Sequence, residues 1–169
     1  MTVPELLYQA ARNWPEHIAI IDQYGTMSYS ELAEAVLETE RKLIDVGPGQ
    51  CIGVMGANSR YFIINAFAVM EAGATVLPLS NQMTQAEMRE IIRTTGMHFL
   101  LEDSIGPAWT EVLDTVLDFP HRKWKKWENP DGDWNKPVAP HVKNPALIRF
   151  TSGTTGASKG VILSHQTIV

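Results

Sequence analysis

The stretch Cys51-Ile52-Gly53-Val54-Met55 is an apolar run with the length and composition of a buried β-strand. A helical pattern follows from about Arg60 to Ala72, Gly73 ends it, and Thr75 to Leu77 forms the next short strand. Strands that alternate with helices in this way form parallel βαβ units, whose helices cover the faces of the sheet. The sequence therefore predicts an α/β fold with a largely parallel sheet and flanking helices.

Three capping boxes mark helix starts on both sides of this unit. In each box a Ser or Thr side chain can accept a bond from the backbone three residues later, where a Glu can bond back. They predict helices from Thr2 to about Asn13, from Ser28 to the stop at Gly47-Pro48, and from Thr84 to about Thr95. Ile18 to Asp22 and Thr26 to Ser28 are expected to form a hairpin, and His98 to Leu101 a further strand.

The alternation of predicted strands and helices becomes less clear after Asp103. Leu113, Val116 and Leu117 recur at a spacing that favours one more helical face. The run HRKWKKW over residues 121–127 interleaves basic and aromatic residues, as nucleic-acid-binding or membrane-surface segments do. Because the run is short and acidic residues follow at once, the preferred interpretation is a solvated edge strand with its two tryptophans partly packed. Residues 128–143 are expected to form a connecting loop.

The stretch FTSGTTGASKG over residues 150–160 joins two further expected strands, Leu147 to Phe150 and Val161 to Leu163. Its glycines let the backbone approach an anion closely, and its hydroxyl groups and lysine can bond phosphate oxygens. It is not a Walker P-loop, because Ser158 stands where the second glycine is needed and Gly160 replaces the Ser or Thr after the lysine. Composition alone leaves two interpretations open: a phosphate-binding loop, or a polar hairpin loop without a ligand.

The order Thr-Ser-Gly-Thr-Thr-Gly-x-x-Lys-Gly-Val over residues 151–161 strongly resembles the signature of the AMP-forming adenylating enzymes. This superfamily includes acyl-CoA synthetases, the adenylation domains of peptide synthetases and firefly luciferase. Met27 to Leu32 resembles the family's T-Y-x-E-L segment, and Met70 to Leu79 its A-G-A-x-x-x-P-L segment. Ser158 departs from the family pattern, which usually has Pro there, but the phosphate-facing residues are intact. The chain is therefore identified as a member, and the resemblance covers nearly all of it.

The resemblance implies a fold and a site. The fold is the N-terminal subdomain of the large domain of an acyl-CoA synthetase-like enzyme. Residues 1–145 would form the α/β subdomain, and residues 146–169 the strand–loop–strand that starts the next one. The residues implied to hold the β- and γ-phosphates of ATP are Thr151, Ser152, Gly153, Thr154, Thr155, Gly156 and Lys159. Mg²⁺ would accompany the ATP without a ligand that can be named in this chain, and the catalytic lysine would lie in a C-terminal domain beyond Val169.

The activity that the resemblance implies is ATP-dependent acyl-CoA synthesis. A carboxylate attacks the α-phosphate of ATP to give an acyl-adenylate and pyrophosphate, and the acyl group then passes to the thiol of CoA. A fatty acid or another simple carboxylic acid is the expected substrate. Because the segments that hold the adenine and the acyl group would follow Val169, this chain alone is expected to be inactive. Its last residues, about twenty, are expected to be mobile, self-associated or covered by a partner chain.

Composition and residue spacing argue against several other classes of function. A net charge of −5 argues against a general nucleic-acid binder. No secretory signal and no apolar run of about 18 residues is present, so a cytoplasmic protein without integral membrane association is expected. Cys51, the single cysteine, is expected to be a buried reduced thiol. The histidines show no metal-ligand spacing, and His165, which follows the loop, is expected to cap or pack at a helix start.

Two other kinds of function stay open beside the acid–thiol ligase. The first is a non-catalytic truncated product or one half of a split adenylating enzyme. The second is a nucleic-acid or membrane-binding module built on the basic tryptophan run. A serine hydrolase is disfavoured, because Phe150 occupies the position of the first glycine in the Gly-x-Ser-x-Gly pattern.

Overall fold

The computed structural model describes residues 1–103, 115–130, 137–151 and 159–169. Seven strands form one sheet in the order β6-β7-β5-β3-β4-β8-β9, and two form a separate hairpin. The strands are β1 Ile18–Asp22, β2 Gly25–Ser28, β3 Cys51–Met55, β4 Thr75–Leu79, β5 Phe99–Asp103, β6 Thr115–Phe119, β7 Arg122–Glu128, β8 Pro145–Thr151 and β9 Lys159–Ser164. The helices are α1 Val3–Asn13, α2 Tyr29–Lys42, α3 Arg60–Glu71, α4 Gln85–Thr95 and α5 His165–Ile168.

The centre of the sheet is parallel. β3 pairs in parallel with both β4 and β5, and β4 pairs in parallel with β8. Antiparallel strands complete the two sides: β7 and β6 follow β5, and β9 follows β8. The predicted α/β fold with a largely parallel sheet is therefore confirmed.

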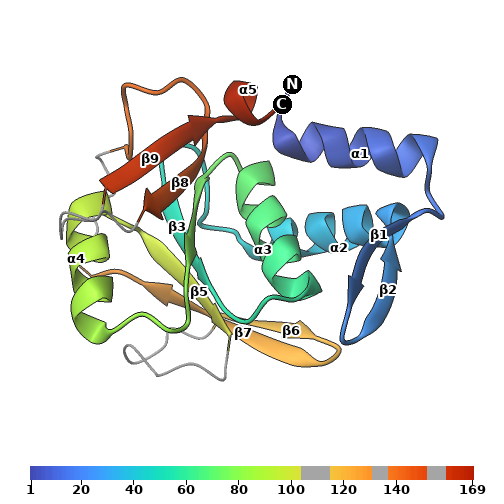
Figure 1. Cartoon of the computed structure of the whole chain (residues 1–169), viewed down its shortest axis with the longest axis horizontal. Helices are drawn as coiled ribbons and strands as arrows, with labels where there is room; N and C mark the ends of the chain where they lie inside the picture. The colour runs from blue at the N-terminus through green and yellow to red at the C-terminus, as the bar shows by residue number, and fades with distance from the viewer. Residues whose placement is uncertain (104–114, 131–136, 152–158) are drawn as a thin grey trace.

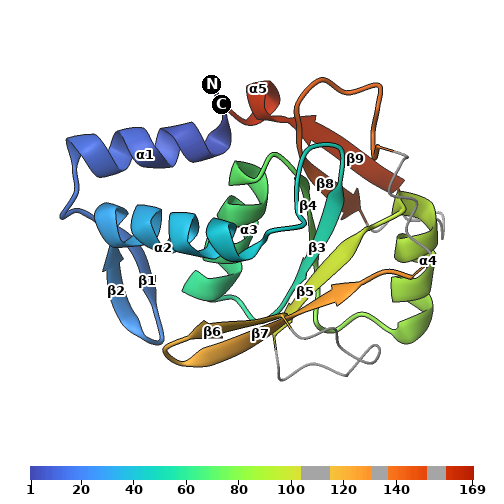
Figure 2. The ribbon, with the colours of Figure 1, turned by 180° about the vertical axis from the view of Figure 1, so that it is seen from behind.

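Helices cover both faces of this sheet. α1, α2 and α3 lie over one face and α4 over the other (Figures 1 and 2). Along β3, Ile52 and Val54 face the first three helices, whereas Cys51 and Met55 face α4. Gly53 also points toward α4, and a Cβ built on it would lie only 2.9 Å from Cδ1 of Leu100. A larger residue there would force the α4 side of the core apart.

All three predicted capping boxes are present. Thr2, Ser28 and Thr84 each accept a bond from the amide of the Glu three residues on, and each Glu side chain bonds back. Such caps satisfy amide groups that the first turn of a helix leaves without an intrahelical acceptor. α3 begins differently, because Ser59 makes no side-chain cap bond and the amide of Arg60 donates to Oδ2 of Asp22 at 2.9 Å.

The β1–β2 hairpin is tied to α3 by the same two residues. Nη2 of Arg60 donates to Oδ1 of Asp22 at 2.6 Å, and both side chains are 11% exposed. Arg60 also donates to the carbonyl of Gly25 at the hairpin turn, at 2.9 Å. The hydrogen bonds from the Arg60 side chain lower the pKa of Asp22 to about 2. The predicted hairpin is therefore present, and its turn is bonded to the main body.

Two predictions for residues 113–127 are wrong. Thr115–Phe119 is a strand and not a helical face: Leu117 and Phe119 both pack beside α3 at the two-residue period of a strand, and β6 pairs along β7. Leu113 lies outside the described residues. β7 is a strand, as preferred, but it lies between β5 and β6 and is not an edge. Trp124 is fully buried and Trp127 is 8% exposed, so neither ring is available to stack on a base.

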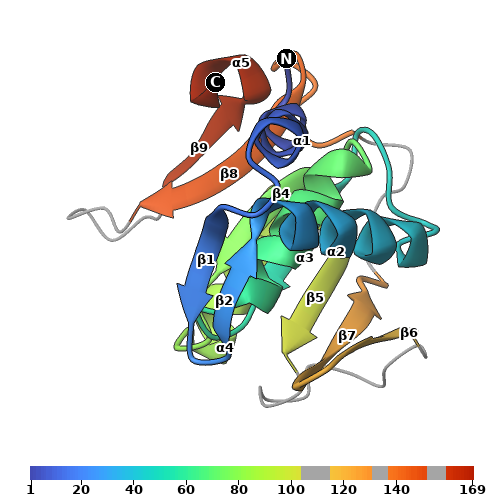
Figure 3. The same ribbon diagram turned by 90° about the vertical axis from the view of Figure 1, so that its right-hand side faces the viewer.

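The β8–β9 hairpin forms one end of the sheet, opposite β6 and β7 (Figure 3). β9 pairs along β8 from Ser164 to Lys159, and it is the last strand of the described sheet. One register pair, Val76 with Leu147, joins β8 to β4, whereas five join β3 to β4. This hairpin therefore has a short ladder to the rest of the sheet.

Candidate functional site

The carboxyl ends of β3 and β4 form the switch point of the parallel sheet. α3 leads from β3 to β4 over one face, and α4 leads from β4 to β5 over the other. The chain therefore leaves the ends of these neighbouring strands in opposite directions. Open α/β sheets bind their ligands in the crevice that such a divergence creates.

A hollow of about 510 Å³ lies at this switch point. One side is formed by Gly56, Ala57 and Asn58 after β3, together with Phe62, and the other by residues 78–82 at the end of β4. These lining residues supply apolar surface, a hydroxyl group and amide groups, and none of them is charged. We did not predict this hollow from the sequence. The sequence feature that could have indicated it is the group of small or polar residues directly after each of two buried strands, 56–58 and 80–82.

The glycine- and hydroxyl-rich loop leaves the sheet at the same edge. β8 runs parallel to β4 and ends at Thr151, which pairs with Lys159 at the start of β9. The structure thus brings the two ends of the predicted phosphate loop together at the carboxyl edge, although it describes these two residues by their backbone alone. Ser152, Gly153, Thr154, Thr155 and Gly156 lie outside the described residues. Their assignment to phosphate binding stays a prediction.

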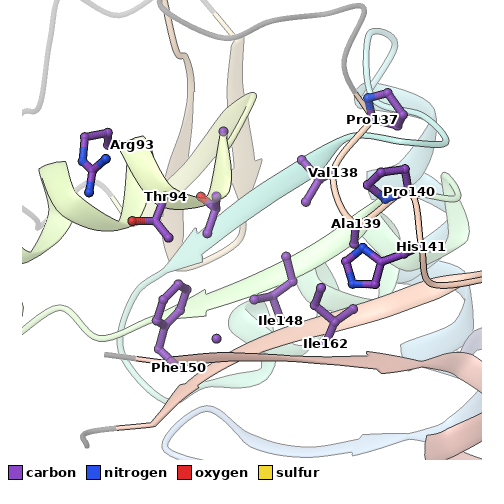
Figure 4. Close-up of a pocket in the computed structure, with 13 residues that line it drawn as sticks. Arg93, Thr94, Pro137, Val138, Ala139, Pro140, His141, Ile148, Phe150 and Ile162 are labelled. Carbon is purple, nitrogen blue, oxygen red and sulfur yellow. The ribbon is translucent and has the colours of Figure 1, made fainter. Parts of the chain in front are cut away.

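A second hollow, of about 380 Å³, lies on the α4 side of the β8–β9 hairpin (Figure 4). Ile148, Phe150 and Ile162 line it from the two strands, and the end of α4 and residues 137–141 line the rest. Arg93 of α4 also lines it, but its guanidinium already donates to Oε1 of Glu90 at 2.6 Å. The largely apolar strand side suits an apolar group of a ligand better than a phosphate.

Cys51 and His98 are buried side by side at the start of the sheet. Burial raises the pKa of the Cys51 thiol to about 12, and a neutral buried thiol is a poor nucleophile. The amide of Cys51 donates to Nδ1 of His98 at 3.1 Å, and this bond ties the starts of β3 and β5 together. The predicted buried thiol is confirmed, and its surroundings are structural.

His165 lies at the far end of β9 from the loop. It is 5% exposed, and its Nδ1 accepts a hydrogen bond from the amide of Val3 at 3.1 Å. Ser164 caps the short helix α5 by accepting from the amide of Thr167. The predicted packing role of His165 at a helix start is therefore confirmed.

Two adjacent carboxyl groups stand near the carboxyl end of β5. Burial raises the pKa of Glu102 to about 7, with a smaller contribution from Asp103, and Lys125 opposes the rise. Oε1 of Glu102 has no hydrogen-bond partner among the described residues. Asp103 follows it in the strand, and its Oδ2 accepts from Nη1 of Arg122 at 3.1 Å. Because neighbours in a strand point to opposite faces, the two groups do not converge on one site.

Within the described ranges, no group of three or more His, Cys, Asp or Glu side chains is arranged to hold a metal ion. In the same parts of the chain, no helix has the length and apolar character needed to cross a membrane.

Comparison with known proteins gives a family match and a set of relatives. The family model described as AMP-binding enzyme matches residues 7–169. Phosphinothricin tripeptide synthetase PhsC of Streptomyces viridochromogenes is 31% identical over 172 residues, which cover 99% of this chain and 16% of that protein. Nonribosomal peptide synthetase sirP of Leptosphaeria maculans is 29% identical over 184 residues, which cover 96% of this chain and 8% of that protein. The chain thus spans a small part of the length of these relatives.

Solved structures share the fold. IdnL1 matches with a TM-score of 0.75 at 23% identity, over 99% of this chain and 34% of that one. The N-terminal subdomain of NpsA from Klebsiella oxytoca, in complex with 3-hydroxybenzoyl-AMSN, matches with a TM-score of 0.71 at 22% identity, over 98% and 41%. PA1221, an NRPS protein containing adenylation and PCP domains, matches with a TM-score of 0.70 at 26% identity, over 97% and 32%.

Proposed function

The chain belongs to the AMP-binding enzyme family, and we propose that it is the N-terminal part of an adenylation domain whose loop 151–159 binds the β- and γ-phosphates of ATP. The family resemblance seen in the sequence is confirmed. The phosphate-binding residues that we propose are the predicted ones: Thr151, Ser152, Gly153, Thr154, Thr155, Gly156 and Lys159.

The observation that carries this proposal is the position of the two ends of the loop, Thr151 and Lys159. Both of its ends lie at the carboxyl edge of the sheet, beside the switch-point hollow formed by residues 56–58 and 78–82. The lining of that hollow is uncharged, so the cation that a triphosphate needs must come from another element. The sequence between these two ends contains hydroxyl groups and glycines, and a lysine follows them, which is the set of groups that we propose meets this need.

The reaction that we propose is the activation of a carboxylic acid. A carboxylate oxygen forms a bond to the α-phosphorus of ATP, the bond from that phosphorus to the bridging oxygen breaks, and pyrophosphate leaves with the electron pair. Because two anions must meet, the protein has to hold the phosphates in line and offset their charge with preorganised donors. Mg²⁺ commonly accompanies nucleotide phosphates, but the described residues form no cluster of ligand side chains for it, and no step is assigned to it.

The names of the relatives do not support the acyl acceptor and the substrate that the sequence led us to expect. The sequence led us to expect CoA as the acceptor and a fatty acid as the substrate. The similar proteins are instead named as peptide synthetases, and PA1221 contains adenylation and PCP domains. These names favour an amino acid or a related small acid as the substrate and a carrier-protein thiol as the acceptor, and they give no support to CoA.

The test is ATP–pyrophosphate exchange by the full-length protein with a panel of amino, aryl and fatty acids. Thr154→Ala and Lys159→Ala should each lower the rate by at least about 100-fold, as the removal of one preorganised donor does. Lys123→Ala removes an exposed lysine of β7 and should leave the rate unchanged. Unchanged exchange in both loop variants would remove the loop from the mechanism.

Two further assays test the acyl acceptor and the activity of this chain alone. Transfer of the activated acid to a carrier-protein thiol, compared with transfer to CoA, decides the acceptor. The chain of 169 residues alone should show no exchange above its own Lys159→Ala variant. Measurable exchange there would show that these residues suffice for adenylation.

A further inference from the structure

We infer that His165 is a positioning residue that fixes the β8–β9 hairpin, and with it the ends of the phosphate loop, to the first turn of α1. Nδ1 of His165 accepts the Val3 amide at 3.1 Å, and the backbone amide of His165 donates to the carbonyl of Asn144 at 3.1 Å. One buried residue thus joins the start of α1, the residue before β8 and the end of β9. This inference rests on the proposed role of the loop.

The bond to Val3 completes the cap of α1. The Glu5 side chain accepts from the amide of Thr2 at 2.6 Å, and the Thr2 hydroxyl accepts from the amide of Glu5 at 3.3 Å. Pro4 has no amide proton, so Val3 carries the one remaining donor that the first turn leaves without an intrahelical acceptor. His165 supplies that acceptor from a residue 162 positions away.

Side chains of the hairpin pack on both faces of the core, Leu147 on the α3 side and Ile148 on the α4 side, but its hydrogen bonds to the body are few. A single register pair joins β8 to β4, and β9 is bonded to β8 alone among the described strands. Thr75 adds one side-chain bond, from its hydroxyl to the carbonyl of Pro145 at 3.3 Å. His165 is therefore a second anchor, at the end of the strand that begins with Lys159. Loss of this anchor would let the hairpin shift relative to β4 and α1.

The acceptor must be the unprotonated imidazole. A proton on Nδ1 would replace the acceptor with a donor that faces the Val3 amide, and the positive end of the helix dipole would disfavour the added charge. Burial lowers the pKa of His165 below the usual 6.5, and the amino terminus of Met1 lowers it further. The Glu5 carboxylate raises it and is the opposing charge. The anchor is thus intact above about pH 6.5 and is lost as the pH falls below it.

Three variants of the full-length protein test this inference. His165→Ala removes the acceptor, whereas His165→Asn keeps an acceptor oxygen that does not titrate. Val3→Pro removes the donor at a helix position where Pro is well tolerated. The Ala and Pro variants should each raise the KM for ATP by about ten-fold with kcat little changed, and their double variant should be no worse than either alone. The Asn variant should match the wild type at pH 7.5.

The pH profile separates this role from a general structural one. The wild-type KM for ATP should rise as the pH falls from 6.5 to 5, and the Asn variant should show no such rise over that range. Amide hydrogen exchange of residues 160–163 should become faster in the Ala and Pro variants. A wild-type KM for ATP in those two variants, or equal pH profiles in the wild type and the Asn variant, would overturn the inference. Failure of the proposed function has a different signature, which is the absence of any effect of Lys159→Ala.

Discussion

Two hairpins of this molecule are held in different ways. The β1–β2 hairpin is bonded at its turn, where Asp22 and Gly25 both bond Arg60 of α3. The β8–β9 hairpin is bonded at its base, where Asn144 and His165 meet each other and His165 meets the start of α1. Figure 1 shows the two hairpins at different ends of the ribbon, one beside α2 and the other beside α5.

The difference follows what each hairpin does. Bonds at the turn make β1–β2 part of the scaffold, since they cap α3 and fix the hairpin in one step. At the base of the β8–β9 hairpin, the bonds of Asn144 and His165 lie at the opposite end of the two strands from the loop. A hairpin that is bonded at its base keeps those bonds away from the loop that we propose binds the ligand.

The largest effect is expected from Asp22→Ala, which breaks the attachment at the turn. It leaves the 11% exposed Arg60 side chain without its carboxylate and removes the acceptor of the first amide of α3. The free energy of unfolding should fall by about 3 kcal/mol in urea denaturation. Glu90→Ala is the matched control, because that pair is also 2.6 Å long but its side chains are 74% and 60% exposed. The loss there should be much smaller than for Asp22→Ala because water screens an exposed pair, and equal losses in the two variants would contradict the role given to burial.

Acid should release the two hairpins in sequence. The pKa of Asp22 is lowered from 3.8 to about 2, so its native form binds fewer protons than the unfolded chain between these values. Its contribution, about 2 kcal/mol, is complete above pH 4 and is lost as the pH falls toward 2. The contribution of His165 is lost earlier, below pH 6.5. Hydrogen exchange corrected for its intrinsic pH dependence should show β9 released before β1 and β2, and simultaneous release would remove the distinction.

The smallest effect is expected at the base of β8. Asn144 has a φ of 51°, in the left-handed region that Asn tolerates better than Ala. Asn144→Ala should lower the free energy of unfolding by about 1 kcal/mol, and Asn144→Gly should change it by less. Thermal unfolding of the two variants measures the difference. A gain in stability from Asn144→Ala would show that the base of this hairpin carries no backbone strain.

Local signals were sufficient for most of the fold. The capping boxes at Thr2, Ser28 and Thr84 and the apolar run at Cys51 depend on neighbours in the sequence, and each lies where it was predicted. The burial of Trp124 depends instead on β6, the segment just before β7 whose apolar spacing we had interpreted as a helical face. Once β6 pairs with the outer side of β7, an apparent edge becomes an interior strand and its tryptophan becomes core.

In the candidate site, too, local sequence signals indicated some features, and contacts between distant segments determine the others. The residue types in loop 151–159 indicated phosphate chemistry because glycines, hydroxyl groups and a lysine act through their local order. The hollow beside it requires that the ends of β3 and β4 be neighbours, which only the sheet order provides. The bond between Val3 and His165 spans nearly the whole chain, and no periodic pattern in the sequence could indicate it.

The contact between Val3 and His165 also has a consequence for the order of events during synthesis. His165, the acceptor of the Val3 amide, is synthesised 162 residues after Val3. The first turn of α1 therefore leaves the ribosome well before β9. At a translation rate of about 5–20 residues per second, that amide waits on the order of 10 to 30 seconds for its partner. The nascent chain therefore carries an incompletely capped first helix until the loop hairpin docks, and this docking joins two segments that are synthesised far apart in time.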